Sequence, residues 1–96
     1  MDAVDVIVEN RNKILKTCAK YGATNVRVFG SCARDDYNAK SDIDILVKFK
    51  KGWHYGHLFQ LQEALENILG RHVDLGTDQM LKPRVRKHVL SEAIKL

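Results

Sequence analysis

The chain has few of the features that mark secreted proteins, proteins with a structural zinc site or membrane proteins. Its 96 residues include two cysteines, one proline and 7% aromatic residues, and no apolar run reaches the roughly 18 residues that a membrane span needs. Cys18 and Cys32 fit neither a disulfide framework nor a zinc spacing, so both are expected to be reduced thiols. The acidic start of the chain argues against a secretory signal. Together these absences predict a cytoplasmic protein that does not span a membrane.

What is present fits one small domain. An apolar content of 45% over 96 residues suffices for one core and leaves little chain for a second, so residues 1–96 are expected to form a single domain. The net charge of +4 and the pI of about 9.2 are compatible with a nucleotide or RNA ligand, and an RNA-binding accessory protein is the weaker alternative. An excess this mild does not by itself lead us to expect direct nucleic-acid binding.

Helical and strand periodicities alternate along the sequence. Apolar residues at helical spacing predict helices over 4–20 and 58–69, each ended by a glycine. Alternating or β-rich runs predict strands over 25–29, 43–49 and 72–76. A short helix is expected after Ser31, and a last one from near Pro83. The apolar residues expected to be buried by this last helix are Val85, Val89, Leu90, Ala93 and Ile94.

The order of these elements predicts an α/β (α+β) fold. We expect a small mixed β-sheet with helices packed on one face. In the second strand Ile43 and its alternate neighbours would form the buried side, which leaves Asp44 and Leu46 on the other side. The open face of the sheet is therefore expected to carry the acids.

Residues 30–44 join a glycine–serine turn to a pair of aspartates. Asp42 and Asp44 stand on one face of the second strand, about 7 Å apart along the chain. Two carboxylates this close repel each other and are tolerated best around a cation. Gly30 lets the backbone approach a phosphate, and Ser31 adds a hydroxyl beside the free N–H groups of a helix start. Alternatively, the Asp-x-Asp is a turn cap and the Gly-Ser an ordinary strand-to-helix turn.

A third aspartate completes the pattern. Asp74 is flanked by two apolar residues and so faces away from them. If its strand lies beside that of Asp44, the two carboxylates are about 5 Å apart. Three such acids suit two Mg²⁺ ions, which in nucleotidyl transfer activate the attacking oxygen and steady the leaving pyrophosphate. Asp74 could complete the acceptor-side metal site or take the acceptor proton.

Three further features allow two interpretations each. Arg34 reaches a phosphate or pairs with Asp35 or Asp42. The aromatic segment 53–57 stacks on a base or partner, or covers one end of the core, which we favour. The basic run 82–88 is a solvated helix face, or it reaches a triphosphate or an acidic patch on a partner.

The pattern of Gly30-Ser31, ten intervening residues, Asp42-x-Asp44 and finally Asp74 resembles the DNA polymerase β-like nucleotidyltransferase superfamily. The short chain and the stretch 81–86 are similar to its minimal nucleotidyltransferase (MNT) branch, the MntA-like antitoxins of HEPN/MNT toxin–antitoxin systems. The resemblance implies that Asp42 and Asp44 bind both metal ions, that Asp74 binds the catalytic one, and that Gly30 and Ser31 hold the triphosphate.

The same resemblance implies a substrate and a partner. ATP would donate AMP to a tyrosine hydroxyl of a HEPN ribonuclease toxin from a neighbouring gene, with Mg²⁺ as cofactor, and so silence it. The alternative is an antitoxin that inhibits its partner by complex formation alone. The sequence leaves open the nucleotide preferred, the number of AMP units added and whether the protein forms homo- or hetero-oligomers.

Overall fold

The computed structural model describes residues 3–29 and 43–96. Four residues of the predicted site, Gly30, Ser31, Arg34 and Asp42, lie outside these ranges. So does the short helix expected after Ser31. Asp44 and Asp74 are the members of the predicted site that the structure describes.

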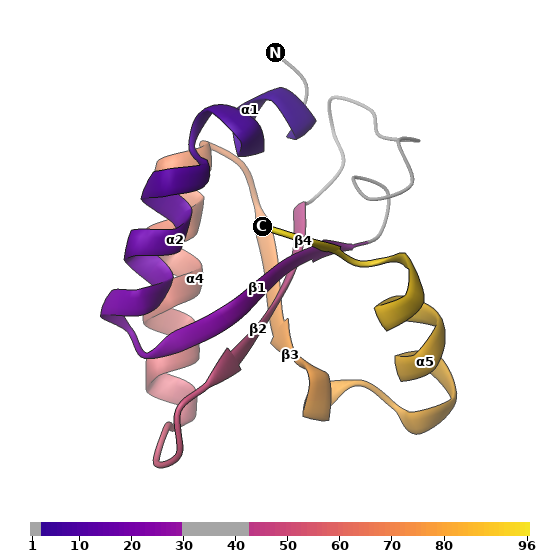
Figure 1. The fold of residues 1–96 in the computed structure, drawn as a ribbon. Coiled ribbons are helices and arrows are strands. Elements are labelled where there is room, and N and C mark those ends of the chain that lie inside the picture. Colours follow the sequence, from indigo (N-terminus) through magenta and orange to yellow (C-terminus); the bar gives the residue numbers. More distant parts are fainter. Residues whose placement is uncertain (1–2, 30–42) are drawn as a thin grey trace.

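A four-stranded mixed sheet organises the domain (Figure 1). The strands are β1 (Ala23–Phe29), β2 (Ile43–Phe49), β3 (Val73–Thr77) and β4 (Ile94–Lys95). Their order across the sheet is β3-β2-β1-β4. β1 runs antiparallel to β2 and β4, whereas β2 and β3 are parallel, as expected for strands joined through a helix. The predicted mixed sheet is confirmed.

Three helices cover one face of this sheet, namely α1 (Ala3–Glu9), α2 (Arg11–Lys20) and α4 (Tyr55–Leu69) (Figure 1). The core lies between them and the sheet. α2 contributes Ile14 and Cys18, and α4 contributes Leu58, Leu61, Leu65 and Leu69. The sheet contributes Ile43, Ile45, Val47, Val73 and Leu75, each at most 4% exposed. In residues 3–29 and 43–96 we find no helix with the length and apolar character needed to cross a membrane.

The single helix expected over 4–20 is two helices in the structure. Asn10 separates α1 from α2, and its side-chain Nδ2 donates to the carbonyl oxygen of Val6 at 2.9 Å. Asparagine side chains compete with the backbone in this way, which favours helix ends over helix interiors. The apolar spacing continues through the break, so periodicity did not reveal it.

The end of α4 matches its prediction. Gly70 follows the helix with φ 67°, in the left-handed region, and its N–H donates to the carbonyl oxygen of Glu66. Glycine reaches this conformation without the steric cost that a Cβ adds. This stop lets the chain turn back into β3 and sets where β3 begins.

The last helix differs from the expectation. α5 (Pro83–Glu92) begins at Pro83 as predicted, but it lies on the opposite side of the sheet from α2 and α4 (Figure 1). None of its residues is buried: Val85 is 40% exposed, and Val89 and Leu90 are half-buried. Ile94 is not part of the helix but of β4, and it is 51% exposed. The predicted burial is wrong because the chain leaves the helix after Glu92 to pair with β1.

Candidate functional site

Asp44 and Asp74 stand side by side on the sheet. They are register partners in the parallel pair β2–β3, and each is the second residue of its strand. Register partners on neighbouring strands are about 5 Å apart and share a face. Asp44 is half-buried and Asp74 is exposed. The expectation that the strand of Asp74 lies beside that of Asp44 is therefore confirmed.

The pair offers the chemistry that a hard divalent cation needs. Carboxylate oxygens are the ligands Mg²⁺ prefers, and the ion usually takes one or two carboxylates with phosphate and water. Within residues 3–29 and 43–96 no group of three acidic, histidine or cysteine side chains converges. Asp44 and Asp74 thus fit as part of a metal site, and Asp42 would have to supply its third carboxylate.

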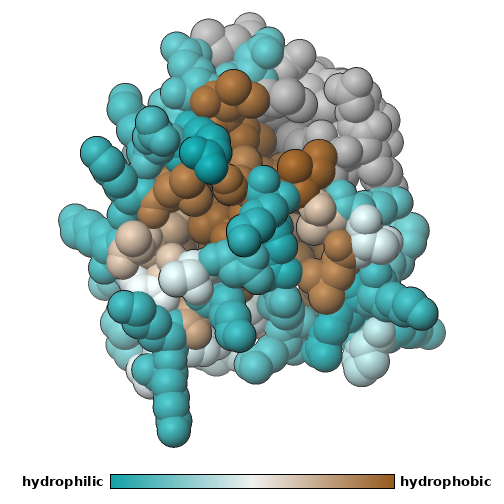
Figure 2. Space-filling model, viewed as in Figure 1, coloured by the Kyte–Doolittle hydropathy of each residue, from teal (hydrophilic) through white to brown (hydrophobic). Residues whose placement is uncertain are grey.

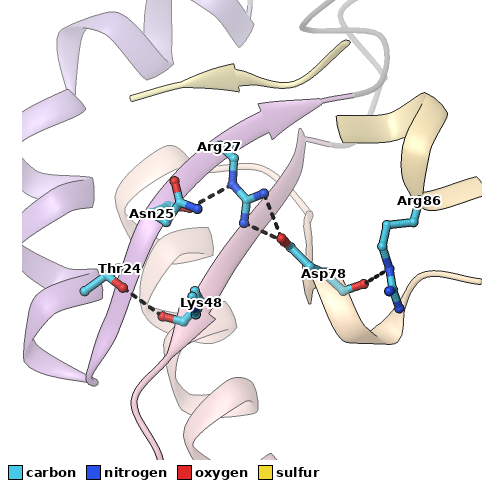
Figure 3. A network of polar contacts seen from close by, with 6 residues as sticks. All are labelled: Thr24, Asn25, Arg27, Lys48, Asp78 and Arg86. Carbon is cyan, nitrogen blue, oxygen red and sulfur yellow. Dashed lines mark hydrogen bonds and ion pairs between the residues drawn. The ribbon is translucent and has the colours of Figure 1, made fainter. Parts of the chain in front are cut away.

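A second polar cluster lies on the same face, further along the strands (Figure 3). Arg27 of β1, 9% exposed, donates from Nη1 to Oδ2 of Asp78 at 3.1 Å and from Nη2 to Oδ1 at 2.5 Å. Its Nε donates to the carbonyl oxygen of Asn25 at 3.0 Å. A bidentate ion pair of this kind is among the stronger ion pairs in proteins, and it fixes the orientation of both side chains.

The side chain of Arg86 in α5 joins the same cluster by donating to backbone carbonyl groups. Its Nε donates to the carbonyl oxygen of Asp78 at 3.0 Å, and its Nη2 donates to that of Leu81 at 3.2 Å. Asp78 begins the short 3₁₀ helix η1 (Asp78–Met80), directly after β3. The cluster of Arg27, Asp78 and Arg86 therefore links β1, the end of β3 and α5. We call it the arginine–aspartate cluster.

Strand register places this cluster on the acid-bearing face. Arg27 is the register partner of Leu46, two residues after Asp44. Asp78 begins η1 directly after β3, and its carboxylate lies on this side because it pairs with Arg27. Sequence periodicity did not indicate this position of Asp78. It gave no indication that Arg27 is buried, because its partner is 51 residues away.

Leu46 was expected on the open face and is found 1% exposed. It is shielded from solvent, but it does not belong to the main core. The reason is that it lies on the side of the sheet that carries Arg27. Its Cδ2 would lie 3.9 Å from a Cβ at Gly76, its register partner on β3. This face is therefore closed around Leu46, whereas Asp74, near the start of β3, is exposed.

Two ambiguous segments have clear places in the structure. Trp53 is half-buried and stacks on Phe49 with ring centroids 4.9 Å apart, while Tyr55 meets its edge at 5.4 Å. The aromatic segment thus covers one end of the core. In the basic run, Arg84, Lys87 and His88 are exposed, whereas Arg86 is half-buried in the arginine–aspartate cluster.

A hollow of about 630 Å³ lies at the other end of the strands from the acids. It is lined by Asn25, Val47, Thr77, Asp78, Gln79 and residues 48–53. Asp44 and Asp74 begin their strands, whereas these residues stand at the ends of β2 and β3. This hollow therefore does not coincide with the paired carboxylates.

Cys18 is excluded as a reactive group. It is fully buried in α2, and burial raises the pKa of its thiol to about 11. A thiol with so high a pKa carries almost no thiolate at neutral pH and is a poor nucleophile.

Comparisons with known proteins agree with this geometry. The family model for the nucleotidyltransferase domain matches residues 11–96. A relative from Methanocaldococcus jannaschii, named as a protein adenylyltransferase, is 38% identical over 92% of this chain and 95% of its own length. Protein adenylyltransferase MntA of Thermococcus cleftensis is 33% identical over 98% of this chain and 93% of its own.

Solved structures show the same fold. One described as a minimal nucleotidyltransferase has a TM-score of 0.89 and 43% identity, and the match covers 100% of this chain and 97% of that one. An MNT antitoxin in complex with a tri-AMPylated HEPN toxin of Shewanella oneidensis has a TM-score of 0.70 and 22% identity, covering 92% and 69%. The second likeness shows the fold alone. On the family match and the relatives together, the chain belongs to the nucleotidyltransferase domain family, in its minimal branch, and is a nucleotidyltransferase.

Proposed function

We propose that this nucleotidyltransferase transfers AMP from ATP to a hydroxyl group, a tyrosine, on a HEPN-domain ribonuclease toxin, and that it thereby acts as the antitoxin of that toxin. The observation that carries the proposal is the register pairing of Asp44 with Asp74, of which Asp74 is exposed. The names of the relatives, which are protein adenylyltransferases, favour AMP as the group transferred.

The residues of the proposed site have separate tasks, except that Asp74 has two. Asp42, Asp44 and Asp74 would be the ligands of two Mg²⁺ ions, which supply positive charge where the attacking and leaving oxygens gain negative charge. Gly30 and Ser31 would bind the triphosphate through backbone N–H groups and a hydroxyl. Arg34 would pair with a phosphate oxygen. Asp74, the exposed member of the pair, is the one accessible to an acceptor hydroxyl.

The proposed reaction makes one bond and breaks one. The acceptor oxygen attacks the α-phosphorus of ATP, the bond from that phosphorus to the bridging oxygen breaks, and pyrophosphate leaves. The acceptor proton passes to Asp74 or to water. Because phosphoryl and nucleotidyl transfer need little covalent help, positioning by the residues named above accounts for most of the protein's contribution.

A protein partner is favoured by the surface as well as by the relatives. Figure 2 shows hydrophobic surface between the α1–α2 side and α5, bordered by hydrophilic side chains. Exposed apolar residues include Val8 at 68% and Ile94 at 51%. Exposed apolar surface rimmed by polar groups is typical of protein contacts. The HEPN partner itself is proposed from the MNT antitoxin complex described above. We place the reaction in the cytoplasm, where ATP and reduced thiols are found.

The test is transfer of label. The protein is incubated with ATP labelled in its α-phosphate, Mg²⁺ and the product of the neighbouring gene. Label should appear on a tyrosine of that product and be lost in Asp44→Asn and in Asp42→Asn. Glu63→Gln, which removes an exposed carboxylate on α4, is the matched control and should retain transfer. Label that persists in both aspartate variants refutes the proposed site.

A second function is favoured by one observation. The 630 Å³ hollow of the described residues lies at the other end of the strands from Asp44 and Asp74. This suits an antitoxin that inhibits its partner by contact. In the same experiment, full inhibition of the partner's ribonuclease activity without any label would establish this function and refute the first.

A further inference from the structure

Polar contacts fasten the helix α5 to the domain in addition to the half-buried apolar side chains of Val89 and Leu90. None of its residues is buried. Its half-buried residues are Arg86, Val89, Leu90 and Glu92, and Ala93 at its C-terminal cap is half-buried as well. Arg86, Val89, Leu90 and Ala93 recur at helical spacing and so mark the side turned toward the domain. Arg86 is the charged residue of this side, and both of its contacts leave α5 for the preceding segment.

Those contacts connect α5 to the sheet through Asp78. The carbonyl oxygen of Asp78 accepts from Arg86, while its carboxylate accepts two bonds from Arg27 of β1 (Figure 3). At the other end of α5, β4 pairs with β1 at the same residue, because Arg27 and Lys95 are register partners. α5 is therefore attached to β1 at both of its ends.

The attachment point lies next to the candidate site. Asp44 is the register partner of Phe29, and Arg27 precedes Phe29 by two residues on the same face. By the rise of a strand, Arg27 lies about 7 Å further along the strand direction than Asp44, which is on the neighbouring strand. A displacement of α5 would thus change the surroundings of the sheet face that carries Asp44 and Asp74.

We propose that Arg86 is a positioning residue. Through Asp78 and Arg27 it fixes α5 as a wall beside the acid-bearing face, and so sets the affinity for the nucleotide without touching it. The inference rests on the proposed function, because it takes a nucleoside triphosphate as the ligand of that face. It assigns the arginine–aspartate cluster a role beyond stability.

The chemistry of arginine suits this task. A guanidinium presents several N–H groups in a fixed plane, so one side chain can donate to the carbonyl oxygens of both Asp78 and Leu81. Lysine has a single flexible ammonium group and would hold the same two acceptors less rigidly. Glutamine removes the charge and is too short to reproduce both bonds.

The test compares two arginines on one helix. Arg86→Gln removes the half-buried arginine, and Arg84→Gln removes an exposed one with the same loss of charge. Binding of a non-hydrolysable ATP analogue with Mg²⁺ is measured by calorimetry, and the KM for ATP and kcat are measured with the partner protein. Amide hydrogen exchange of α5 is followed in the same samples.

We expect Arg86→Gln to bind the analogue roughly tenfold more weakly, as loss of charged hydrogen bonds predicts. The KM for ATP should rise while kcat at saturating ATP stays near the wild-type value. The α5 amides should exchange faster while those of α2 and α4 are unchanged. Arg84→Gln should remain within about twofold of the wild type, as exposed charges usually do. Arg86→Lys should fall between the two.

Three results would overturn the inference. Equal affinities of Arg86→Gln and Arg84→Gln refute it, as does unchanged hydrogen exchange of α5 in Arg86→Gln. If Arg86→Gln does not fold, Arg86→Lys decides, and wild-type affinity in that variant refutes the positioning role. If the wild type itself neither binds the analogue nor transfers AMP, the proposed function fails together with the inference. If the wild type does both and only the comparison of the arginine variants fails, the positioning role alone is refuted.

Discussion

Replacing Asp74 by asparagine should stabilise the protein when no metal ion is present. Asp74 and Asp44 are register partners about 5 Å apart, and within the described residues no hydrogen bond or ion pair of Asp74 is found. Two unit charges at this distance repel by about 0.8 kcal/mol at the permittivity of water and about 3 kcal/mol at an effective permittivity of 20. Because Asp74 is exposed, the lower value applies.

A gain of this size is measurable in a chain of 96 residues. It should raise Tm by about 3–6 °C in dilute buffer containing EDTA. In 1 M salt the Debye length falls to about 3 Å, so the difference between Asp74→Asn and wild type should vanish. Glu63→Gln serves as the control for charge loss elsewhere and should show no gain.

Magnesium should reverse the order of stability of the wild type and Asp74→Asn. A ligand at a hundred times its Kd stabilises a folded protein by about 2.7 kcal/mol, and the wild type, with both carboxylates, should gain more of this than Asp74→Asn. The wild type is then the more stable form in Mg²⁺ and the less stable form in EDTA. A lower Tm for Asp74→Asn in dilute EDTA buffer would mean that the carboxylate of Asp74 is structural, and it would refute the reasoning.

Three further predictions concern the fold. Leu65→Ala, at a position 0% exposed on α4, should lower the free energy of unfolding by about 2–5 kcal/mol in urea titrations, while the exposed Phe59→Ala should cost less. Gly70→Ala, at φ 67°, should cost about 1 kcal/mol, because a Cβ is disfavoured in the left-handed region; an unchanged Tm would contradict this. Burial raises the pKa of Cys18 from 9.0 to about 11, so the thiol loses its proton at a lower pH in the unfolded chain than in the folded one. The free energy of unfolding should therefore fall as the pH rises from about 9 to 11. Cys18→Ala should remove this fall in denaturation series measured from about pH 8 to 11.

The sequence predicted the pairing of Asp44 with Asp74 better than it predicted the last third of the fold. Asp44 and Asp74 were placed correctly because alternation along a strand has a period of two, and each aspartate lies between apolar residues. The stop of α4 at Gly70 followed from the conformational freedom of glycine. Both inferences need only local chemistry.

What failed depends on contacts between distant segments. Val85, Val89, Leu90, Ala93 and Ile94 have the spacing of a buried helix face, yet α5 packs beside a polar face and Ile94 pairs with β1. The burial of Arg27 follows from Asp78, which no local pattern connects to it. Asn10 interrupts the first helix through a side-chain bond that apolar periodicity does not register.

The alignment of β2 with β3 has a consequence for insertions and deletions. Asp74 meets Asp44 only because residues 70–72 have the length that brings Val73 opposite Ile43. One residue more or fewer in this connection would turn Asp74 inward and set an aliphatic side chain opposite Asp44, even though every acid remained in the sequence. Variants of this protein that keep all its aspartates but change the length of that three-residue link should therefore be inactive as enzymes, and their defect would be invisible to any inspection of residue identity alone.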